Sequence, residues 1–242
     1  MLKAVIFDID NTLYDYDAAH APAFQALTAF ACETFSLTPQ RFAELHRSAE
    51  RELEIRCGGN CAAVHNRLLR YQALLERLGQ PIAYAPGMSK LYWSTLLEAM
   101  RPYPDAVETM ARLKAMGLTI GIGTNMTAEN QYEKLARIGA MPYVDFMVTS
   151  EEVTAEKPDR RLFDACAKKA GCAPEACAFV GDSVSKDVRG AMNAGMRAIW
   201  FCREGEPDRA IPGATTIRAL SELPELLAEC RNTFDTKEEP CP

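Results

Sequence analysis

Two aspartates stand two residues apart where the first apolar run of the chain ends. The run closes as Phe7-Asp8-Ile9-Asp10, and alternate side chains of an extended segment point to the same side, so the two carboxylates are expected to be neighbours. Carboxylates that lie close together repel each other, and either a proton on one of them or a bound cation relieves the repulsion. The pair is therefore a candidate for acid–base chemistry, nucleophilic attack or metal binding.

More carboxylates follow a later apolar run. Gly181-Asp182-Ser183 ends that run, and Asp187 stands five residues after Asp182. If this run lies beside the first one, three or four carboxylates converge without a paired cysteine or histidine. Oxygen-only ligands favour Mg²⁺, which proteins usually hold through a few carboxylates, water and substrate phosphate.

Two further segments carry groups that suit a phosphate. Gly123-Thr124-Asn125 offers a hydroxyl and backbone N–H groups at the start of a predicted helix. Lys157, in Glu156-Lys157-Pro158-Asp159, places an ammonium group that can balance a phosphate or an aspartate. An aspartate near Mg²⁺ and lysine can attack phosphorus to form an aspartyl-phosphate, and a second carboxylate can protonate the leaving oxygen and then activate water. In-line phosphoryl transfer chiefly needs such positioning and charge neutralisation.

Each of these motifs is weak when taken alone. An isolated Asp-x-Asp or Gly-Asp pair is more often a turn, a lone threonine at a strand end is usually a helix cap, and Lys-Pro usually lies in a solvated loop. Their shared position at the ends of apolar runs favours one common site, because ligands of open α/β sheets bind at the carboxyl ends of the strands.

The apolar pattern predicts an α/β protein with a Rossmann-like parallel sheet. Short runs rich in β-branched or aromatic residues are typical of buried parallel strands, and helical patterns alternate with the later runs, as in βαβ units. The predicted strands are Leu2–Asp8, Leu118–Thr124, Asp145–Thr149, Cys177–Asp182 and Arg197–Cys202. The predicted helices between them span residues 105–116, 127–138, 160–170 and 183–194.

A long interval without a strand pattern separates the first strand from the second. Apolar residues recur there at helical spacing from Phe24 to Phe35 and from Phe42 to Leu53, and Thr38-Pro39 suits the start of a helix. Further helices fit residues 61–78 and 84–100. The interval therefore predicts a helical subdomain inserted into the α/β domain.

The resulting division of the chain has three parts. Residues 1–13 and 102–231 are expected to form the α/β core, and residues 14–101 the helical insertion. Residues 232–242 are polar and acidic with two prolines, and we expect them to be disordered.

Composition excludes several classes of protein. A chain of 242 residues, 48% hydrophobic and 25% charged, is long and apolar enough for about one or two domains, and it needs no disulfide or metal staple. A formal net charge of −6 argues against binding to nucleic-acid polymers or anionic membranes. No signal peptide or membrane-spanning run is expected. The odd number of cysteines, 9, favours reduced thiols in a cytoplasmic protein, and Cys57-x3-Cys61 with His65 lacks the second half of a zinc site. We expect a monomer or a homodimer.

Four motifs in this order resemble those of the haloacid dehalogenase-like hydrolase superfamily. They are FDIDNTL at 7–13, GTN at 123–125, EKPD at 156–159 and GDSVSKDV at 181–188, and the resemblance covers most of residues 1–205. It implies that Asp8 is the nucleophile and Asp10 the general acid and base. It also implies that the helical insertion is the α-helical cap of this superfamily.

The resemblance further implies which residues hold phosphate and metal. The phosphoryl oxygens would be bound by Thr124, Asn125 and Lys157. Thr124 and Lys157 also belong to the implied catalytic set, since Lys157 would bridge the nucleophile and the phosphate. The Mg²⁺ ligands would be Asp8, the backbone carbonyl of Asp10, and Asp182. Asp187 would support the metal through water or hold Lys157.

The predicted activity is that of a Mg²⁺-dependent phosphatase acting on a small soluble phosphate monoester of the nucleotide or sugar phosphate class. Asp10 favours a phosphatase or phosphomutase over a dehalogenase, which has no leaving oxygen to protonate. A phosphomutase of the β-phosphoglucomutase type shares every motif, and a phosphate-binding regulator without catalysis is a third interpretation. More loosely, the DNTLYD start and SEEVTAEKPD at 150–159 resemble pyrimidine nucleotidases and N-acylneuraminate-9-phosphatases.

Polar residues of the insertion leave two interpretations open, contact with the substrate or a solvated loop between helices. These residues are Arg56, Gly58, Gly59, Asn60, His65 and Arg67. Tyr14 and Tyr16 follow the first motif directly and could line the cleft, although packing in the core or at the hinge is favoured for both.

Overall fold

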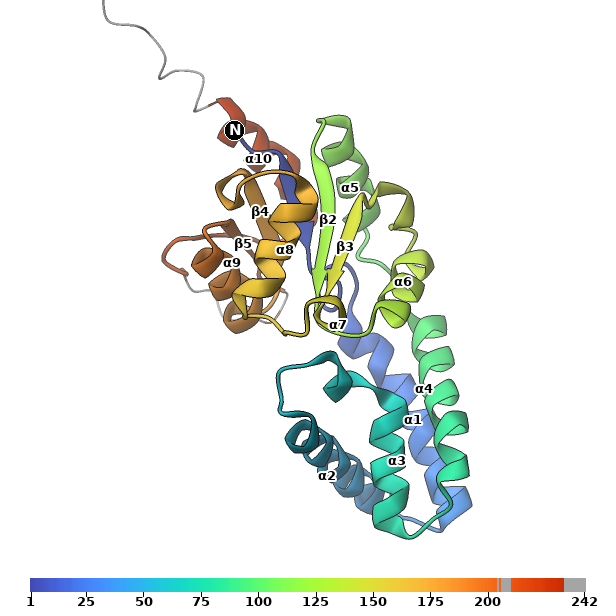
Figure 1. Cartoon of the computed structure of the whole chain (residues 1–242). Coiled ribbons are helices and arrows are strands. Elements are labelled where there is room, and N and C mark those ends of the chain that lie inside the picture. The colour runs from blue at the N-terminus through green and yellow to red at the C-terminus, as the bar shows by residue number, and fades with distance from the viewer. Residues whose placement is uncertain (204, 206–209, 233–242) are drawn as a thin grey trace, which may run out of the picture.

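Five buried apolar runs and one half-buried edge strand form a six-stranded parallel sheet with the strand order β3-β2-β1-β4-β5-β6 (Figure 1). The computed structural model describes residues 1–203, 205 and 210–232. The strands are β1 Ala4–Phe7, β2 Thr119–Thr124, β3 Phe146–Thr149, β4 Cys177–Gly181, β5 Arg197–Phe201 and β6 Ala214–Ile217. The first strand lies in the interior of the sheet and pairs with β2 and β4, which brings the ends of these three strands together.

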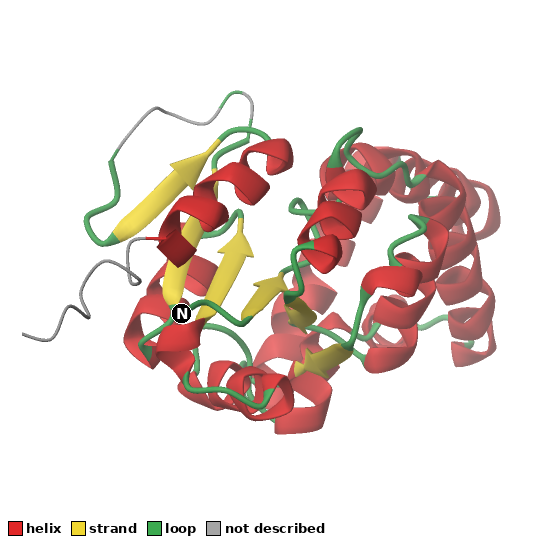
Figure 2. Ribbon diagram, turned by 90° about the horizontal axis from the view of Figure 1, so that it is seen from above, coloured by secondary structure: helices red, strands yellow, loops and turns green. Residues whose placement is uncertain are grey.

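Helices cover both faces of the sheet, as Figure 2 shows from above. Side chains of β1 alternate between the faces: Val5 and Phe7 belong to one hydrophobic cluster, and Ala4 and Ile6 to the other. Both clusters are buried, which explains why the strands are apolar throughout. The helices of the core are α5 Ala106–Ala115, α6 Ala128–Arg137, α7 Ser150–Val153, α8 Arg160–Ala170, α9 Arg189–Ala194 and α10 Leu223–Asn232.

The inserted residues fold into four helices beyond the carboxyl end of the sheet (Figure 1). They are α1 Tyr16–Phe35, α2 Pro39–Cys57, α3 Arg67–Leu78 and α4 Ala85–Ala99. Local sequence sets their starts: Asp15 accepts a hydrogen bond from the Ala18 amide, and Thr38 accepts one from the Arg41 amide. The apolar stripes are buried between the helices, with Leu27 of α1 fully covered. None of the helices in the described ranges is long and apolar enough to cross a membrane.

The predicted fold class is confirmed, and several details of the prediction were wrong. Strand β6 was missed because Ala214–Ile217 is short and mostly half-buried at the sheet edge, so it carries no long apolar run. The helix predicted for 61–78 is a 3₁₀ turn at Ala62–His65 followed by α3, because the Asn66 side chain accepts a hydrogen bond from the Leu69 amide and starts a new helix. Residue 232, the first of the tail predicted for 232–242, is instead the last residue of α10, and residues 233–242 lie outside the described residues.

The helix predicted for 183–194 is also divided. Its first part is a π-helical turn at Val184–Val188, and only Arg189–Ala194 is α-helical. Within the wide turn, Asp187 is buried and its Oδ2 accepts a hydrogen bond from the Ser183 amide at 2.9 Å. The wider turn thus places a carboxylate under the end of β4, and such turns are frequent at functional sites.

Candidate active site

The ends of β1, β2 and β4 open into one cavity of about 380 Å³. All the core residues predicted to form the site line this cavity, namely Asp8, Asp10, Thr124, Asn125, Lys157, Asp182 and Asp187. The opposite wall comes from the inserted helices and includes Tyr16, Arg67, Arg70 and Trp93. The topology explains the convergence, because parallel neighbouring strands end at the same edge of the sheet.

Asp8 and Asp187 share one buried lysine. The Nζ of Lys157 lies 2.7 Å from an oxygen of Asp8 and 2.7 Å from an oxygen of Asp187. Burial raises the pKa of Asp8 to about 6 against the opposing effect of Lys157, and the charges of Asp187 and Asp10 raise it further. Burial lowers the pKa of Lys157, but the two carboxylates outweigh it and hold that pKa above its usual value, so the ammonium stays charged.

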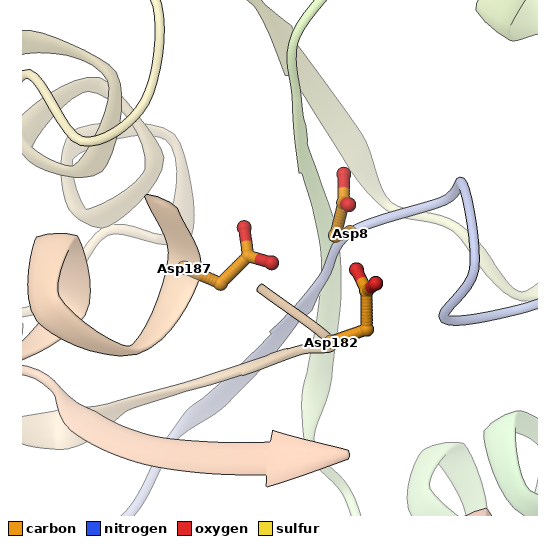
Figure 3. A group of neighbouring side chains, drawn as sticks. All are labelled: Asp8, Asp182 and Asp187. Atoms are coloured by element: carbon orange, nitrogen blue, oxygen red, sulfur yellow. The ribbon is translucent and has the colours of Figure 1, made fainter. Parts of the chain in front are cut away.

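Asp182 adds a third carboxylate to this pair. One carboxylate oxygen from each of Asp8, Asp182 and Asp187 lies within 4.8 Å of the other two. Figure 3 shows the three side chains grouped together. Burial raises the pKa of Asp182 to about 7, and the charges of Asp8 and Asp187 add to the rise. Gly181 is required here, because a Cβ at this position would overlap the Asp187 carboxylate.

The three carboxylates fit a hard divalent cation. All the ligands are oxygens, and the cluster sets three carboxylates against two cations, the ammonium of Lys157 and, beside Asp182, the guanidinium of Arg203. A cation such as Mg²⁺ supplies the missing positive charge and prefers this donor set. The carboxylate of Asp10 lies outside the cluster of three, so only its backbone carbonyl could contribute to the metal as predicted.

Asp10 instead pairs with a lysine that the sequence did not single out. The Nζ of Lys134 lies 2.8 Å from both carboxylate oxygens of Asp10, and the Tyr14 hydroxyl donates to Oδ1 at 2.5 Å. Burial alone would raise the pKa of Asp10, but Lys134 and Tyr14 hold it below its usual value. Lys134 is fully buried, on the same face of α6 as the buried Gln131. The spacing of Lys134 from Gln131 gave no signal of this burial in the sequence, because both side chains are polar.

Thr124 and Asn125 are held in place by hydrogen bonds to two other segments. The Gln131 side chain donates to the Thr124 hydroxyl at 2.6 Å, and the Lys157 amide donates to the Asn125 side-chain oxygen at 2.8 Å. The Nδ2 of Asn125 is buried and has no hydrogen-bond partner among the described residues. It is therefore a donor available to an oxyanion in the cavity.

The polar residues of the insertion divide into three groups. Arg56 is exposed and pairs with Glu52 and Glu76, away from the cavity. Asn60 accepts a hydrogen bond from the Glu156 amide at 2.7 Å, and His65 Nε2 lies 2.8 Å from the Glu156 carboxylate. These contacts join the insertion to the loop that carries Lys157, a role that neither interpretation of the sequence included. His65 also lines the cavity, and its contact with the substrate stays a prediction.

Gly58 and Gly59 have φ values of 75° and 76°, which glycine adopts without strain in the turn that precedes Asn60.

Arg67, at the start of α3, is the one residue of this polar group that is both buried and part of the cavity lining. Of the two tyrosines, Tyr14 is buried against Asp10, as the packing interpretation predicts, and Tyr16 lines the cavity.

Comparison with known proteins agrees with this geometry. The model of the haloacid dehalogenase-like hydrolase family matches residues 2–195. The chain belongs to this family. Ribulose-1,5-bisphosphate 5-phosphatase of Halopiger xanaduensis is 36% identical over 86% of the chain and 88% of its own length, and glyceraldehyde 3-phosphate phosphatase of Methanothermobacter thermautotrophicus is 35% identical over 94% and 100%. The crystal structure of a phosphatase of this family from Thermococcus onnurineus superposes with a TM-score of 0.72, at 28% identity over 93% of the chain and 98% of that structure.

Proposed function

We propose that the protein hydrolyses a small phosphate monoester in a Mg²⁺-dependent reaction that passes through an aspartyl-phosphate on Asp8. The family is established, and the two relatives compared above are named as phosphatases of small sugar phosphates, which supports the phosphatase predicted from the sequence. The observation that carries the proposal is the meeting of Asp8, Asp182 and Asp187 around Lys157 in one cavity.

Asp8 is the proposed nucleophile. Lys157 fixes one oxygen of its carboxylate and leaves the other free to attack phosphorus, while the Asn125 side-chain amide and the Thr124 hydroxyl receive the phosphoryl oxygens. Mg²⁺ would be held by Asp8, Asp182 and the backbone carbonyl of Asp10, with Asp187 contributing directly or through water. When bound, it would neutralise phosphate charge and lower the pKa of the carboxyl groups that hold it.

Asp10 is the proposed acid and base. Its pKa lies below the usual value in the free protein, so the carboxylate starts ionised. A phosphate group bound beside it raises that pKa, and the carboxylate then takes up the proton that a monoanionic ester carries. That proton passes to the leaving oxygen as the P–O bond breaks. The regenerated carboxylate next removes a proton from the water that attacks the aspartyl-phosphate.

We also propose that residues 14–101 act as a cap over a core of residues 1–13 and 102–231. The contacts of Asn60 and His65 with Glu156 hold the helical bundle against the loop of Lys157, and the cavity lies between the two parts. Closure of this kind keeps water away from phosphoryl transfer while the substrate is bound.

Hydrolysis of p-nitrophenyl phosphate by the purified protein tests the activity. We expect release of inorganic phosphate with Mg²⁺, its loss on chelation, and loss of at least about a thousandfold in kcat for Asp8→Asn. Asp164→Asn, on the exposed side of α8, is the matched control and leaves kcat unchanged. Full activity of Asp8→Asn, or hydrolysis independent of Mg²⁺, would contradict the proposal. Conversion of a hexose 1-phosphate to its isomer without net phosphate release would identify a phosphomutase instead.

A further inference from the structure

The cavity wall that faces the carboxylate cluster contains a buried arginine, Arg67, with a side chain that pairs with no acid of the described residues. Arg67 is 7% exposed, and it donates to the His65 carbonyl oxygen at 3.1 Å and to the Tyr16 hydroxyl at 3.1 Å. Its guanidinium also lies 5.0 Å from the centre of the Tyr92 ring. These partners are all neutral, and the Nε of Arg67 is buried without any hydrogen-bond partner. A buried guanidinium is costly unless an anion pairs with it.

The next arginine on the same helix shows the contrast. Arg70 stands three residues after Arg67 on α3 and is 4% exposed, but its Nη2 lies 2.7 Å from a carboxylate oxygen of Glu50. Both arginines line the cavity, and of the two only Arg70 has a counter-ion among the described residues. The charge of Arg67 is therefore left for a group that enters the cavity.

We propose that Arg67 binds a second anionic group of the substrate, a carboxylate or a second phosphate, at the opposite end of a short carbon chain from the phosphate that Asp8 attacks. This inference rests on the proposed phosphatase function and adds the substrate class. A guanidinium pairs with either anion through two parallel hydrogen bonds. The cavity of about 380 Å³ is near the lower limit for ligand sites, which favours a compact substrate.

The position of the cationic group also orients such a substrate. The carboxylates of Asp8, Asp182 and Asp187 repel an anion unless a metal ion or Lys157 neutralises their charge. Arg67, on the other wall of the cavity, attracts an anion. A substrate with a neutral end leaves Arg67 unpaired, and a site built around a buried polar group discriminates strongly against a ligand that cannot satisfy it.

A matched series of three-carbon substrates tests the role of Arg67. Glycerol 3-phosphate has a neutral end, 3-phosphoglycerate has a carboxylate there, and glycerol 1,3-bisphosphate has a second phosphate. For the wild type we expect kcat/KM to be at least about 10-fold higher for one or both of the substrates with an anionic end than for glycerol 3-phosphate. The member of the series that is favoured identifies the anion as carboxylate, phosphate or either.

Replacement of the arginine then separates binding from structure. The methionine of Arg67→Met fills a similar volume. We expect this variant to lower kcat/KM for the favoured substrates by about 10- to 100-fold, chiefly by raising KM, while its kcat/KM for glycerol 3-phosphate stays within about threefold of the wild-type value. Arg67→Lys retains part of the preference. Arg41→Met, on the exposed face of α2, is the control and changes neither value. An equal loss for all three substrates would assign Arg67 a structural role and overturn the proposal.

Calorimetry with a catalytically blocked protein keeps this test independent of turnover. In the Asp8→Asn background we expect the favoured member of the series to bind at least about tenfold more tightly than glycerol 3-phosphate, and Arg67→Met to abolish the difference. Equal affinities, or a preference that survives Arg67→Met, would overturn the inference. Failure of the proposed function is distinct from this: the wild type would then hydrolyse none of these esters with Mg²⁺, whether or not Arg67 selects the ligand.

Discussion

The two aspartates of the first motif each face a buried lysine, yet the two pairs differ in charge balance. Lys157 lies 2.7 Å from Asp8 but also 2.7 Å from Asp187, whereas Lys134 lies 2.8 Å from both oxygens of Asp10 and is paired with no other acid in the described chain. Burial acts to raise the pKa of both carboxyl groups. Lys157 only partly opposes this at Asp8, whose pKa is raised to about 6, whereas Lys134 and the Tyr14 hydroxyl hold the pKa of Asp10 below its usual value.

The two aspartates therefore lie in different electrostatic environments. The cluster around Asp8 has more negative than positive charge, which a bound cation would balance, while Asp10 has its own lysine and the Tyr14 hydroxyl. A single Asp-x-Asp motif thus serves two electrostatic environments a few ångströms apart, one suited to nucleophilic attack beside a metal and one suited to proton transfer. The predictions below test that division.

Loss of Lys157 has the largest expected effect. Lys157→Met leaves Asp8 and Asp187 buried without their shared cation, so Asp8 is protonated or misplaced, and we expect kcat to fall by about a thousandfold. Lys168→Met, at an exposed position of α8, is the control and leaves kcat unchanged. Steady-state kinetics with p-nitrophenyl phosphate measures both. A Lys157→Met protein that retains more than about a tenth of the activity would show that the lysine is dispensable to the nucleophile.

Loss of Lys134 is expected to cost less and to change the pH profile. Lys134→Met removes the main group that lowers the pKa of Asp10, so burial raises that pKa and the carboxylate becomes protonated at a higher pH. We expect a fall of about 10- to 100-fold in kcat near neutral pH, with the acid limb of the kcat profile displaced to higher pH. A pH-rate profile from pH 4 to 9 measures the displacement. An unmoved limb would mean that Asp10 is not the group that titrates in turnover.

These two lysines also show what the sequence could and could not predict. Lys157 was found because it stands in an ordered motif next to the end of a predicted strand. Lys134 lies in the middle of α6, a helix that also carries the exposed charged residues Glu133 and Arg137. A charged residue in such a segment is typical of a solvated helix face. Its burial arises only because the inserted helices cover that face, which no local pattern encodes.

The same reason limits what the sequence says about the insertion. The spacing of apolar residues predicted helices there, because each stripe is local to one helix. The positions of Asn60, His65 and Arg67 depend on how the bundle sits on the core, which is set by contacts between residues about 100 positions apart, such as that of Asn60 with Glu156. The strand ends were predictable for the opposite reason, since parallel pairing places them at one edge whatever the loops do.

Metal binding is expected to stabilise the Asp8 cluster in a pH-dependent way. Burial raises the pKa of Asp8 to about 6 and that of Asp182 to about 7, from a usual value of 3.8, so the metal-free folded protein holds these protons more tightly than the unfolded chain does. Metal-free stability therefore decreases as the pH rises from about 4 to about 7. Mg²⁺ replaces the lost protons, and at 100 times its Kd it adds about 2.7 kcal/mol to the free energy of unfolding at pH 8 and less at pH 5.

Thermal unfolding with and without Mg²⁺ at these two pH values measures the effect. Asp182→Asn removes one of the buried charges, so this variant should be more stable than the metal-free wild type at pH 8 and should gain little from Mg²⁺. Asp164→Asn is the exposed control and keeps the wild-type response. Equal stabilisation by Mg²⁺ at both pH values would contradict the carboxylate cluster as the binding site.

Loss of the Tyr14 hydroxyl has the smallest expected effect and tests the Asp10 environment most finely. Burial and the charge of Asp10 raise the pKa of Tyr14 above its usual value, so the phenol keeps its proton and donates a hydrogen bond to Asp10 Oδ1. Tyr14→Phe keeps the ring in its buried position and removes only that hydrogen bond. A hydrogen bond to a charged group is worth about 1.5 kcal/mol or more, which corresponds to about one pH unit in the pKa of Asp10.

The acid limb of the kcat profile should therefore move upward for Tyr14→Phe, but less than for Lys134→Met, and kcat should fall about threefold to tenfold below the limb while staying near the wild-type value at pH 8. The order of the two displacements is the informative result, because the ammonium contributes both charge and hydrogen bonds whereas the phenol contributes a hydrogen bond alone. A larger displacement for Tyr14→Phe would reverse the division proposed here and make Tyr14, rather than Lys134, the principal group that keeps Asp10 ionised.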